Sequence, residues 1–311
     1  MKTAFLFPGQ GSQSVGMGED FYKEFDFVRE IFDMTEEICQ LPIARLCFKG
    51  PIETLTETVN LQPAITAVNL AVLSALQREN ADLSMAAGHS LGEYGALAAA
   101  SAISFEDAVR LVFRRGELMH KESLRHQGVM HAVVGLSIEE VDRLVKEAGD
   151  DAPVSVANHN TAEQIVITGA PAPVEQVSKM AAEKGARTVP LKVSGAWHSE
   201  LIRGAEAPFA AALERAVFSA PAVPVIHNVT AAPEEAPEEI RKLMSRQLCS
   251  PVRWYDSVLR MLDEGVDAFV EVGPGRVLTG LVKKIVDRDT PIRQFSINSL
   301  KAYEIFLEQA A

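Results

Sequence analysis

The five residues Gly88-His89-Ser90-Leu91-Gly92 constrain the fold of this chain more than any other stretch. The pentapeptide pattern recurs by chance, but here apolar residues precede it at 83 and 85–87 and small residues follow from 92 to 100. That context predicts a strand, a tight turn and a helix. Glycine is favoured at 88 and 92 because a side chain would clash where two backbones approach. Ser90 is then the candidate nucleophile, at a helix N-terminus that stabilises negative charge.

The rest of the chain alternates predicted strands and helices, which is typical of an α/β protein. Residues 3–7 form an apolar strand that ends at residues 8–13, a loop rich in glycine and glutamine. This loop is either a ligand-binding loop at the sheet edge or an ordinary turn into a helix. Further along, a long helix is expected to open at Pro63.

Residues 129–193 differ in character and predict a compact unit of their own. Strands are expected at 129–136, 154–157, 164–168 and 188–193, with helices at 137–148 and 173–184 and a turn at 158–160. The order βαββαβ is the ferredoxin-like pattern. The sequence therefore predicts a discontinuous large domain, residues 1–124 and 197–311, and a small domain, residues 125–196, inserted into it.

Composition indicates a globular protein and excludes several classes of function. The 311 residues carry a formal net charge of −12, which argues against a nucleic-acid-binding protein. No membrane span and no signal peptide are predicted, so a cytoplasmic location is expected. Cys39, Cys47 and Cys249 match neither a disulfide framework nor a zinc site, and we expect reduced, buried thiols.

Two further side chains are candidates for a functional site. His198 follows Trp197 at the seam where the chain returns to the predicted large domain, and ligands often bind in clefts between domains. This position favours His198 among the seven histidines. Arg115 lies beside Arg110 and Arg114 on a predicted amphipathic helix, where most arginines are solvated.

Taken together, the motifs of this chain resemble those of the malonyl-CoA:acyl-carrier-protein transacylases and of the related acyltransferase domains of fatty-acid and polyketide synthases. In chain order they are Gly9-Gln10-Gly11-Ser12-Gln13, Gly88-His89-Ser90-Leu91-Gly92-Glu93, Arg115-Gly116, Trp197-His198, Gln247 and Gly273-Pro274-Gly275. The resemblance covers nearly the whole chain, and the joint match is more specific than any single motif. It implies an α/β-hydrolase-like large domain interrupted by a ferredoxin-like small domain.

The resemblance also implies catalytic roles for matched residues. Ser90 is the implied acyl-accepting nucleophile and His198 the implied general base and acid, a dyad without the usual carboxylate. The backbone carbonyl of Gln247 is expected to orient the imidazole. The backbone N–H groups of Gln10 and Leu91 are the implied oxyanion hole, which stabilises the charge that develops on a thioester carbonyl under attack.

The implied substrates are malonyl-CoA and acyl carrier protein, joined by a ping-pong cycle through a malonyl-serine intermediate. Arg115 is the implied clamp for the free malonyl carboxylate, because a guanidinium pairs with a carboxylate through two parallel hydrogen bonds. Trp197 stands where relatives carry phenylalanine or a smaller residue, which leaves the width of the acyl pocket open. Lys283 and Lys284 are candidates for a surface that docks the acidic carrier protein.

The expected enzyme needs no metal and no bound cofactor, binds neither nucleic acid nor a membrane, and is a monomer. The alternative is an acyl hydrolase of the same superfamily that clears acyl groups from carrier proteins, although a clamp such as Arg115 favours malonyl transfer. A third interpretation is a non-catalytic carrier-binding module. The pathway, fatty acid or polyketide, stays open because the transfer chemistry is the same in both.

Overall fold

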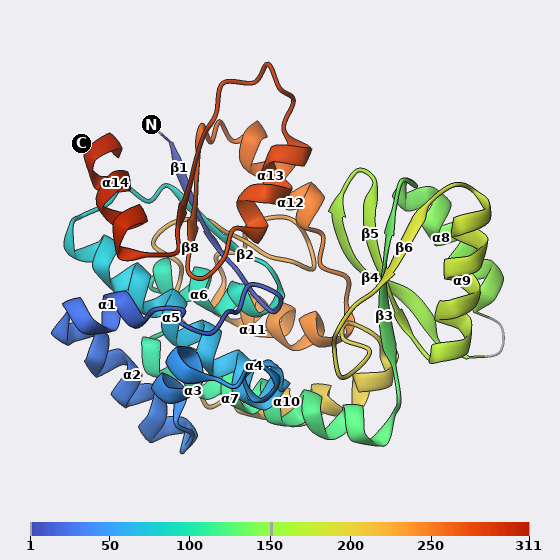
Figure 1. The fold of residues 1–311 in the computed structure, drawn as a ribbon, viewed down its shortest axis with the longest axis horizontal. Coiled ribbons are helices and arrows are strands. Elements are labelled where there is room, and N and C mark those ends of the chain that lie inside the picture. The colour runs from blue at the N-terminus through green and yellow to red at the C-terminus, as the bar shows by residue number, and fades with distance from the viewer. Residues whose placement is uncertain (1, 150–151, 311) are drawn as a thin grey trace.

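The computed structural model describes residues 2–149 and 152–310 and arranges them as two lobes, each built on one sheet (Figure 1). The larger sheet has five parallel strands in the order β7-β2-β1-β8-β9. These strands are β1 (Thr3–Phe7), β2 (Met85–Gly88), β7 (Val225–Ile226), β8 (Ala268–Val272) and β9 (Arg293–Ile297). This sheet with its covering helices is the large lobe, and residues 129–190 are the small lobe. The α/β-hydrolase-like architecture with a second, smaller unit is confirmed.

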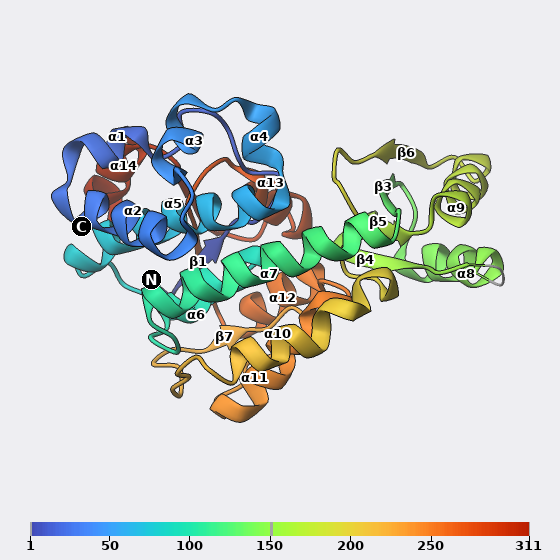
Figure 2. The same cartoon turned by 90° about the horizontal axis from the view of Figure 1, so that it is seen from below.

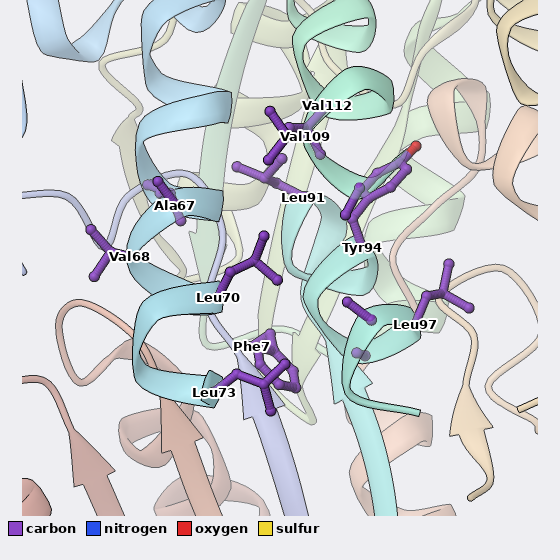
Figure 3. Close-up of a cluster of buried hydrophobic side chains, with 14 of the residues drawn as sticks. Phe7, Ala67, Val68, Leu70, Leu73, Leu91, Tyr94, Leu97, Val109 and Val112 are labelled. Carbon is purple, nitrogen blue, oxygen red and sulfur yellow. The ribbon is translucent and has the colours of Figure 1, made fainter. Parts of the chain in front are cut away.

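Both faces of the large sheet are covered by helices. Phe5 and Phe7 of β1 face a core formed with α5 (Thr58–Arg78) and α6 (Glu93–Ala99), across which α7 (Phe105–Arg125) packs. Figure 3 shows Phe7 in one cluster with Leu70 and Leu73 of α5. The intervening residues of β1 face a second core under α12 (Trp254–Asp263) and α13 (Val277–Ile285). Burial on both faces explains why the central strands β1 and β2 consist mainly of apolar residues, whereas the edge strand β9 is more exposed and more polar.

The other helical segments surround these layers, with the N-terminal ones beside α5 and α7 and the C-terminal one on the same side (Figure 2). They are α1 (Glu19–Glu24), α2 (Asp26–Cys39), α3 (Ile43–Lys49), α4 (Ile52–Thr56), α10 (Glu206–Leu213), α11 (Pro237–Arg246) and α14 (Leu300–Ala310), with short 3-10 turns η1 (Ser90–Gly92), η2 (Glu200–Ala205) and η3 (Gln247–Cys249).

Helix α5 differs from the prediction at its start. It begins at Thr58 and carries Pro63 inside it, so the expectation of a helix opening at Pro63 is wrong. Proline lacks the N–H that would bond one turn back. Burial of every residue from 60 to 73 offsets this loss. Within the described residues α5 is also the one helix long and apolar enough to cross a membrane, but 89% of its most apolar window is buried inside the protein. It is a core helix.

The small lobe confirms the ferredoxin-like prediction. Its four antiparallel strands lie in the order β4-β5-β3-β6, and α8 and α9 share one core with the sheet. In chain order the elements are β3 (Val129–Val134), α8 (Ile138–Ala148), β4 (Val154–Thr161), β5 (Gln164–Gly169), α9 (Pro171–Glu183) and β6 (Arg187–Pro190). A capping box between Ser137 and Glu140 begins α8.

One turn in the small lobe was placed wrongly from the sequence. Residues 158–160 lie within β4, and the turn between β4 and β5 falls at residues 162–163. The large lobe keeps this segment extended, because the His159 N–H donates to the Val252 carbonyl at 2.9 Å and the Val252 N–H donates to the Ala157 carbonyl at 2.8 Å. Polar residues that suit a turn therefore extend a strand along the seam between the lobes.

The connections between the lobes run from α7 into β3 and from β6 back toward residue 197 (Figure 2). Chain division at residues 125 and 196 stays a prediction.

The cysteines are free thiols. Cys39 and Cys47 are buried as expected, whereas Cys249 is only partly buried because it ends η3 at the molecular surface. Burial raises the pKa of Cys39 and of Cys249 to about 12, so both thiols stay protonated near neutral pH.

Candidate active site

The loops that follow β1, β2 and β8 meet at the carboxyl edge of the parallel sheet, where α/β folds place their ligands. The turn after β2 requires glycine at both predicted positions. A Cβ on Gly92 would lie 1.8 Å from the Phe7 carbonyl oxygen, and one on Gly88 would lie 2.0 Å from the carbonyl carbon of Gly92. Such contacts are far inside van der Waals distance. The strand, turn and helix around Ser90 therefore depend on close backbone approach.

Ser90 itself adopts a positive φ of 51°, a conformation that costs energy for a residue with a side chain. Asn228 stabilises this turn from the end of β7. Its Oδ1 accepts from the Ser90 N–H at 2.7 Å, and its Nδ2 donates to the Gly88 carbonyl at 2.6 Å. The buried amide thus fixes both sides of the turn and presents the Ser90 hydroxyl to the seam between the lobes.

His198 lies on the other side of that hydroxyl. The distance from Ser90 Oγ to His198 Nε2 is 2.8 Å, and His198 Nδ1 lies 2.9 Å from the Gln247 carbonyl oxygen. A carbonyl only accepts hydrogen bonds, so Nδ1 carries the proton and Nε2 is free to accept from the serine. Burial, and then the nearby Arg115 charge, lower the pKa of His198 to about 3. The imidazole is therefore neutral and available as a base.

Arg115 extends from α7 into the same site, with 2% of its surface exposed. Its Nη2 donates to Ser90 Oγ at 3.1 Å and to Gln247 Oε1 at 3.2 Å, and its Nη1 donates to Gln62 Oε1 at 3.0 Å. Burial lowers the pKa of Arg115. An arginine held beside a nucleophile without a paired carboxylate can bind an anionic substrate group.

The loop after β1 approaches the serine turn from the opposite side. A Cβ on Gly9 would lie 2.5 Å from the His89 carbonyl oxygen and 3.5 Å from the Leu91 nitrogen. Gln10 and Leu91, the two residues expected to supply the oxyanion hole, both line the cavity in front of Ser90. The structure thus places the loop of residues 8–13 at the site.

A cavity of about 180 Å³ joins these groups and lies between the lobes. Trp197 lines it with 5% of its surface exposed, and the His89 ring, also in the lining, is 2.9 Å from Asn160 Oδ1 of the small lobe. The remaining lining residues are Gly9, Met119, Met130, Asn158, Gln164, Val166, Leu191, Val193, Val277, Leu278 and Leu281. Most of the wall is apolar.

Several polar residues of the site escaped sequence reasoning. Gln62, Asn160, His227 and Asn228 lie in unrelated segments without a motif. Glu93 appeared only as part of the serine motif, and its carboxylate is buried behind the cavity, where it accepts from Gln247 Nε2. Across residues 2–149 and 152–310, no group of three or more histidine, cysteine or carboxylate side chains is arranged to hold a metal ion.

The two lysines proposed for docking lie away from the reacting groups. Lys283 and Lys284 are exposed on α13, whose residues Val277, Leu278 and Leu281 line the cavity. Lys284 Nζ also donates to Gln164 Oε1 of the small lobe at 3.2 Å. They therefore stand near the cavity and near the seam.

Comparison with known proteins gives one consistent result. Residues 4–300 match the acyl transferase domain family. The malonyl CoA-acyl carrier protein transacylase of Bacillus subtilis is 41% identical over 286 residues, which cover 91% of this chain and 90% of the relative. An acyl carrier protein S-malonyltransferase from Vibrio cholerae is 37% identical and superposes with a TM-score of 0.93 over 98% of this chain and 100% of that one.

A second solved structure is a malonyl-transacylase in complex with its type II polyketide-synthase acyl-carrier protein. It superposes with a TM-score of 0.95 at 37% identity and covers 99% of this chain and 100% of that chain. The fold of this chain thus recurs along the full length of related enzymes. This chain belongs to the acyl transferase family, among the malonyl-CoA:acyl-carrier-protein transacylases.

Proposed function

We propose that this enzyme moves a malonyl group from malonyl-CoA to the phosphopantetheine thiol of an acyl carrier protein, through a malonyl ester on Ser90. The relatives' names and the carrier complex of one solved relative support the substrates. The observation that carries the proposal is the position of Arg115, 3.1 Å from the Ser90 hydroxyl that itself lies 2.8 Å from His198. The site combines an activated nucleophile with a cation for a carboxylate-bearing acyl group.

In the first half-reaction Ser90 Oγ attacks the thioester carbonyl while its proton passes to His198 Nε2. The backbone N–H groups of Gln10 and Leu91 stabilise the oxyanion. Collapse of the tetrahedral intermediate breaks the carbon–sulfur bond, the sulfur takes the proton from His198, and free CoA leaves. Because Gln247 holds Nδ1, the imidazole stays oriented while its Nε2 gains and loses the proton.

In the second half-reaction the carrier thiol attacks the malonyl ester. Its proton passes to His198, the carbon–oxygen bond breaks, and the same proton returns to Ser90 Oγ. The oxyanion donors act again, since the charge develops at the same oxygen. Malonyl-carrier protein then leaves, and the enzyme is restored.

Arg115 selects malonyl over acetyl groups in this scheme. The malonyl carboxylate pairs with the buried guanidinium of Arg115. An acetyl group has no carboxylate, so it leaves the guanidinium buried without a carboxylate partner. The acidic carrier protein would dock beside α13, where Lys283 and Lys284 are exposed. A cytoplasmic monomer remains our expectation for the whole protein.

Intact-mass measurement after mixing with malonyl-CoA or acetyl-CoA, without carrier, tests the proposal. We expect a malonyl adduct on the wild type, none on Ser90→Ala, and preferential acetyl loading of Arg115→Ala. Steady release of free malonate without an adduct would instead indicate the acyl hydrolase. If neither an adduct nor free malonate is detected, the non-catalytic carrier-binding module is the remaining interpretation.

A further inference from the structure

A buried carboxylate lies behind the nucleophile, and the proposed chemical steps do not use it. Glu93 begins α6, three residues after Ser90, and 1% of its surface is exposed. Its Oε1 accepts from His227 Nδ1 at 2.7 Å. Its Oε2 accepts from Gln247 Nε2 at 2.6 Å and from the Asn228 N–H at 3.4 Å. Both oxygens therefore accept from nitrogen donors, and burying a carboxylate without such partners would be costly.

The two neighbours of this carboxylate hold the reacting groups. Asn228 fixes the turn at Ser90 through its side-chain amide. Gln247 orients His198 through its backbone carbonyl and contacts Arg115 through its side-chain Oε1 at 3.2 Å. Glu93 is thus linked through a single intervening residue, either Asn228 or Gln247, to the Ser90 turn, to His198 and to Arg115. It contacts none of the reacting atoms itself.

The Gln247 side chain is an amide whose two ends have opposite hydrogen-bonding character. Its Nε2 donates to the Ser90 carbonyl at 2.9 Å and to Glu93, while its Oε1 faces the Arg115 guanidinium. A reversed amide would point its oxygen at two acceptors and its N–H₂ group at a cation. A carboxylate at 93 can only accept, so together with the Ser90 carbonyl it stabilises the orientation that presents an acceptor to Arg115.

From this geometry we propose that Glu93 is a positioning residue for acyl selection: it fixes the Gln247 amide, and Gln247 in turn aims Arg115 at the malonyl carboxylate. This inference rests on the proposed function. His227 holds the other oxygen of the Glu93 carboxylate. It is fully buried, and its hydrogen bond to Oε1 sets the rotamer that directs Oε2 at Gln247.

Glu93→Gln replaces an obligatory acceptor by an amide that can present either end to Gln247. We expect Ser90 acylation by malonyl-CoA to lose about tenfold in kcat/KM, the effect of one hydrogen bond to a charged group, with little change for acetyl-CoA. The malonyl-to-acetyl preference therefore falls. A purely structural defect lowers the active fraction for both substrates equally and leaves this preference unchanged. If Glu93 only countered the charge of Arg115, Glu93→Gln would raise the malonyl-to-acetyl preference, because Arg115 would then attract the malonyl carboxylate more strongly.

Glu122→Gln is the matched control. Glu122 is also a buried carboxylate, on α7, where Oε1 pairs with Arg125 at 2.8 Å. Its substitution should lower thermal stability without moving the preference. His227 supplies variants that keep the charge at 93: His227→Ala should lower the preference about threefold, and His227→Gln, which retains a donor, should restore most of it.

The decisive experiment measures acylation of Ser90 by malonyl-CoA and acetyl-CoA, by intact mass over time, for wild type, Glu93→Gln, Arg115→Ala and the double variant. We expect the Glu93→Gln effect on preference to vanish in the Arg115→Ala background, because the signal passes through Arg115. An unchanged or increased preference in Glu93→Gln overturns the inference, as does a decrease that persists without Arg115. If Glu93→Gln does not fold, the two His227 variants decide in the same way.

Failure of the proposed function has a separate signature, since the wild type would then form no malonyl-Ser90 adduct at all.

Discussion

The two lobes supply different polar groups to the active-site cavity. The large-lobe wall carries Ser90, His198, Arg115 and Gln247 in one connected set of hydrogen bonds. The small-lobe wall carries Met130 and Val166 together with three amide side chains, those of Asn158, Asn160 and Gln164. One wall holds charges and proton-transfer groups at fixed distances, and the other gives the cavity its shape.

The two walls have different tolerances for change. Groups that exchange protons or pair with charge need positions fixed to fractions of an ångström, and buried hydrogen-bond networks provide that rigidity. The small-lobe side chains take no part in the proposed proton transfers, so these residues can change with smaller consequences. Breaking the large-lobe wall should therefore cost more activity than changing the small-lobe wall.

The largest effect is expected for His198→Ala. Loss of a general base typically lowers the rate by about 10²- to 10⁴-fold, so malonyl transfer should fall by that order. Val166→Ala, which trims the facing small-lobe wall, should change kcat/KM by less than about threefold, because one or two methyl groups contribute modestly in an apolar pocket. Stopped-flow or quench kinetics of Ser90 acylation compare the two. Equal losses would contradict the division between the walls.

Arg115→Ala should have the next largest effect. Loss of a charge-assisted pair with the malonyl carboxylate is expected to lower kcat/KM for malonyl-CoA by about 10²-fold, while acetyl loading is kept or improved. Arg114→Ala is the matched control, since Arg114 is exposed on the same helix and pairs with Glu117. A loss of malonyl loading of similar size in both variants would show that charge on α7, rather than the buried guanidinium, is responsible.

Asn160→Ala cuts the hydrogen bond that joins the walls, between Asn160 Oδ1 and His89. We expect a loss of about tenfold in kcat/KM, because His89 precedes Ser90 and its partly buried ring nitrogen would be left without its partner. Asn160→Asp retains an acceptor and should recover part of the activity. Steady-state transfer assays at fixed carrier concentration measure both variants. An unchanged kcat/KM in Asn160→Ala would show that the hydrogen bond between the lobes does not contribute to activity.

The pH profile tests whether the large-lobe wall keeps its base neutral. Burial and Arg115 lower the pKa of His198 from the ordinary 6.5 to about 3. The acylation rate should therefore show no acid limb near 6.5, and in Arg115→Ala the limb should move upward. For stability the sign is opposite to that of a histidine whose charged form is stabilised by a partner: the unfolded chain binds a proton below 6.5 and the native chain does not. His198 thus subtracts stability as the pH falls from 6.5 toward 3. An acid limb at 6.5 in the wild type would indicate a solvated imidazole.

The smallest effect on transfer is expected for the exposed lysines of α13. Replacing Lys283 and Lys284 by alanine should raise the KM for carrier protein about threefold, with acylation by malonyl-CoA unchanged, because exposed charges steer association more than they bind. Lys146→Ala and Lys179→Ala, on the outer helices of the small lobe, serve as controls. Identical carrier kinetics in all variants would place the docking surface elsewhere.

Local sequence determined the elements whose cause is local. The serine turn, the capped helix α8 and the βαββαβ order follow from residue types at short spacing, and the structure contains all three. The motifs also identified Ser90, His198 and Arg115. In the structure the Ser90 hydroxyl lies within hydrogen-bond distance of both other side chains. Local patterns misplaced Pro63 and residues 158–160, because tertiary packing outweighed weak local preferences there.

Tertiary structure alone decided how the site is held. Glu93 meets Gln247 across 154 residues of sequence, and Ser90 meets Asn228 across 138. No spacing rule links such positions, because a hydrogen bond between distant segments depends on which faces the packed helices and strands turn toward each other. The sequence supplied the reacting groups as a short list of motifs. Their distances and the network behind them follow from burial of polar side chains between distant segments that only the folded chain brings together.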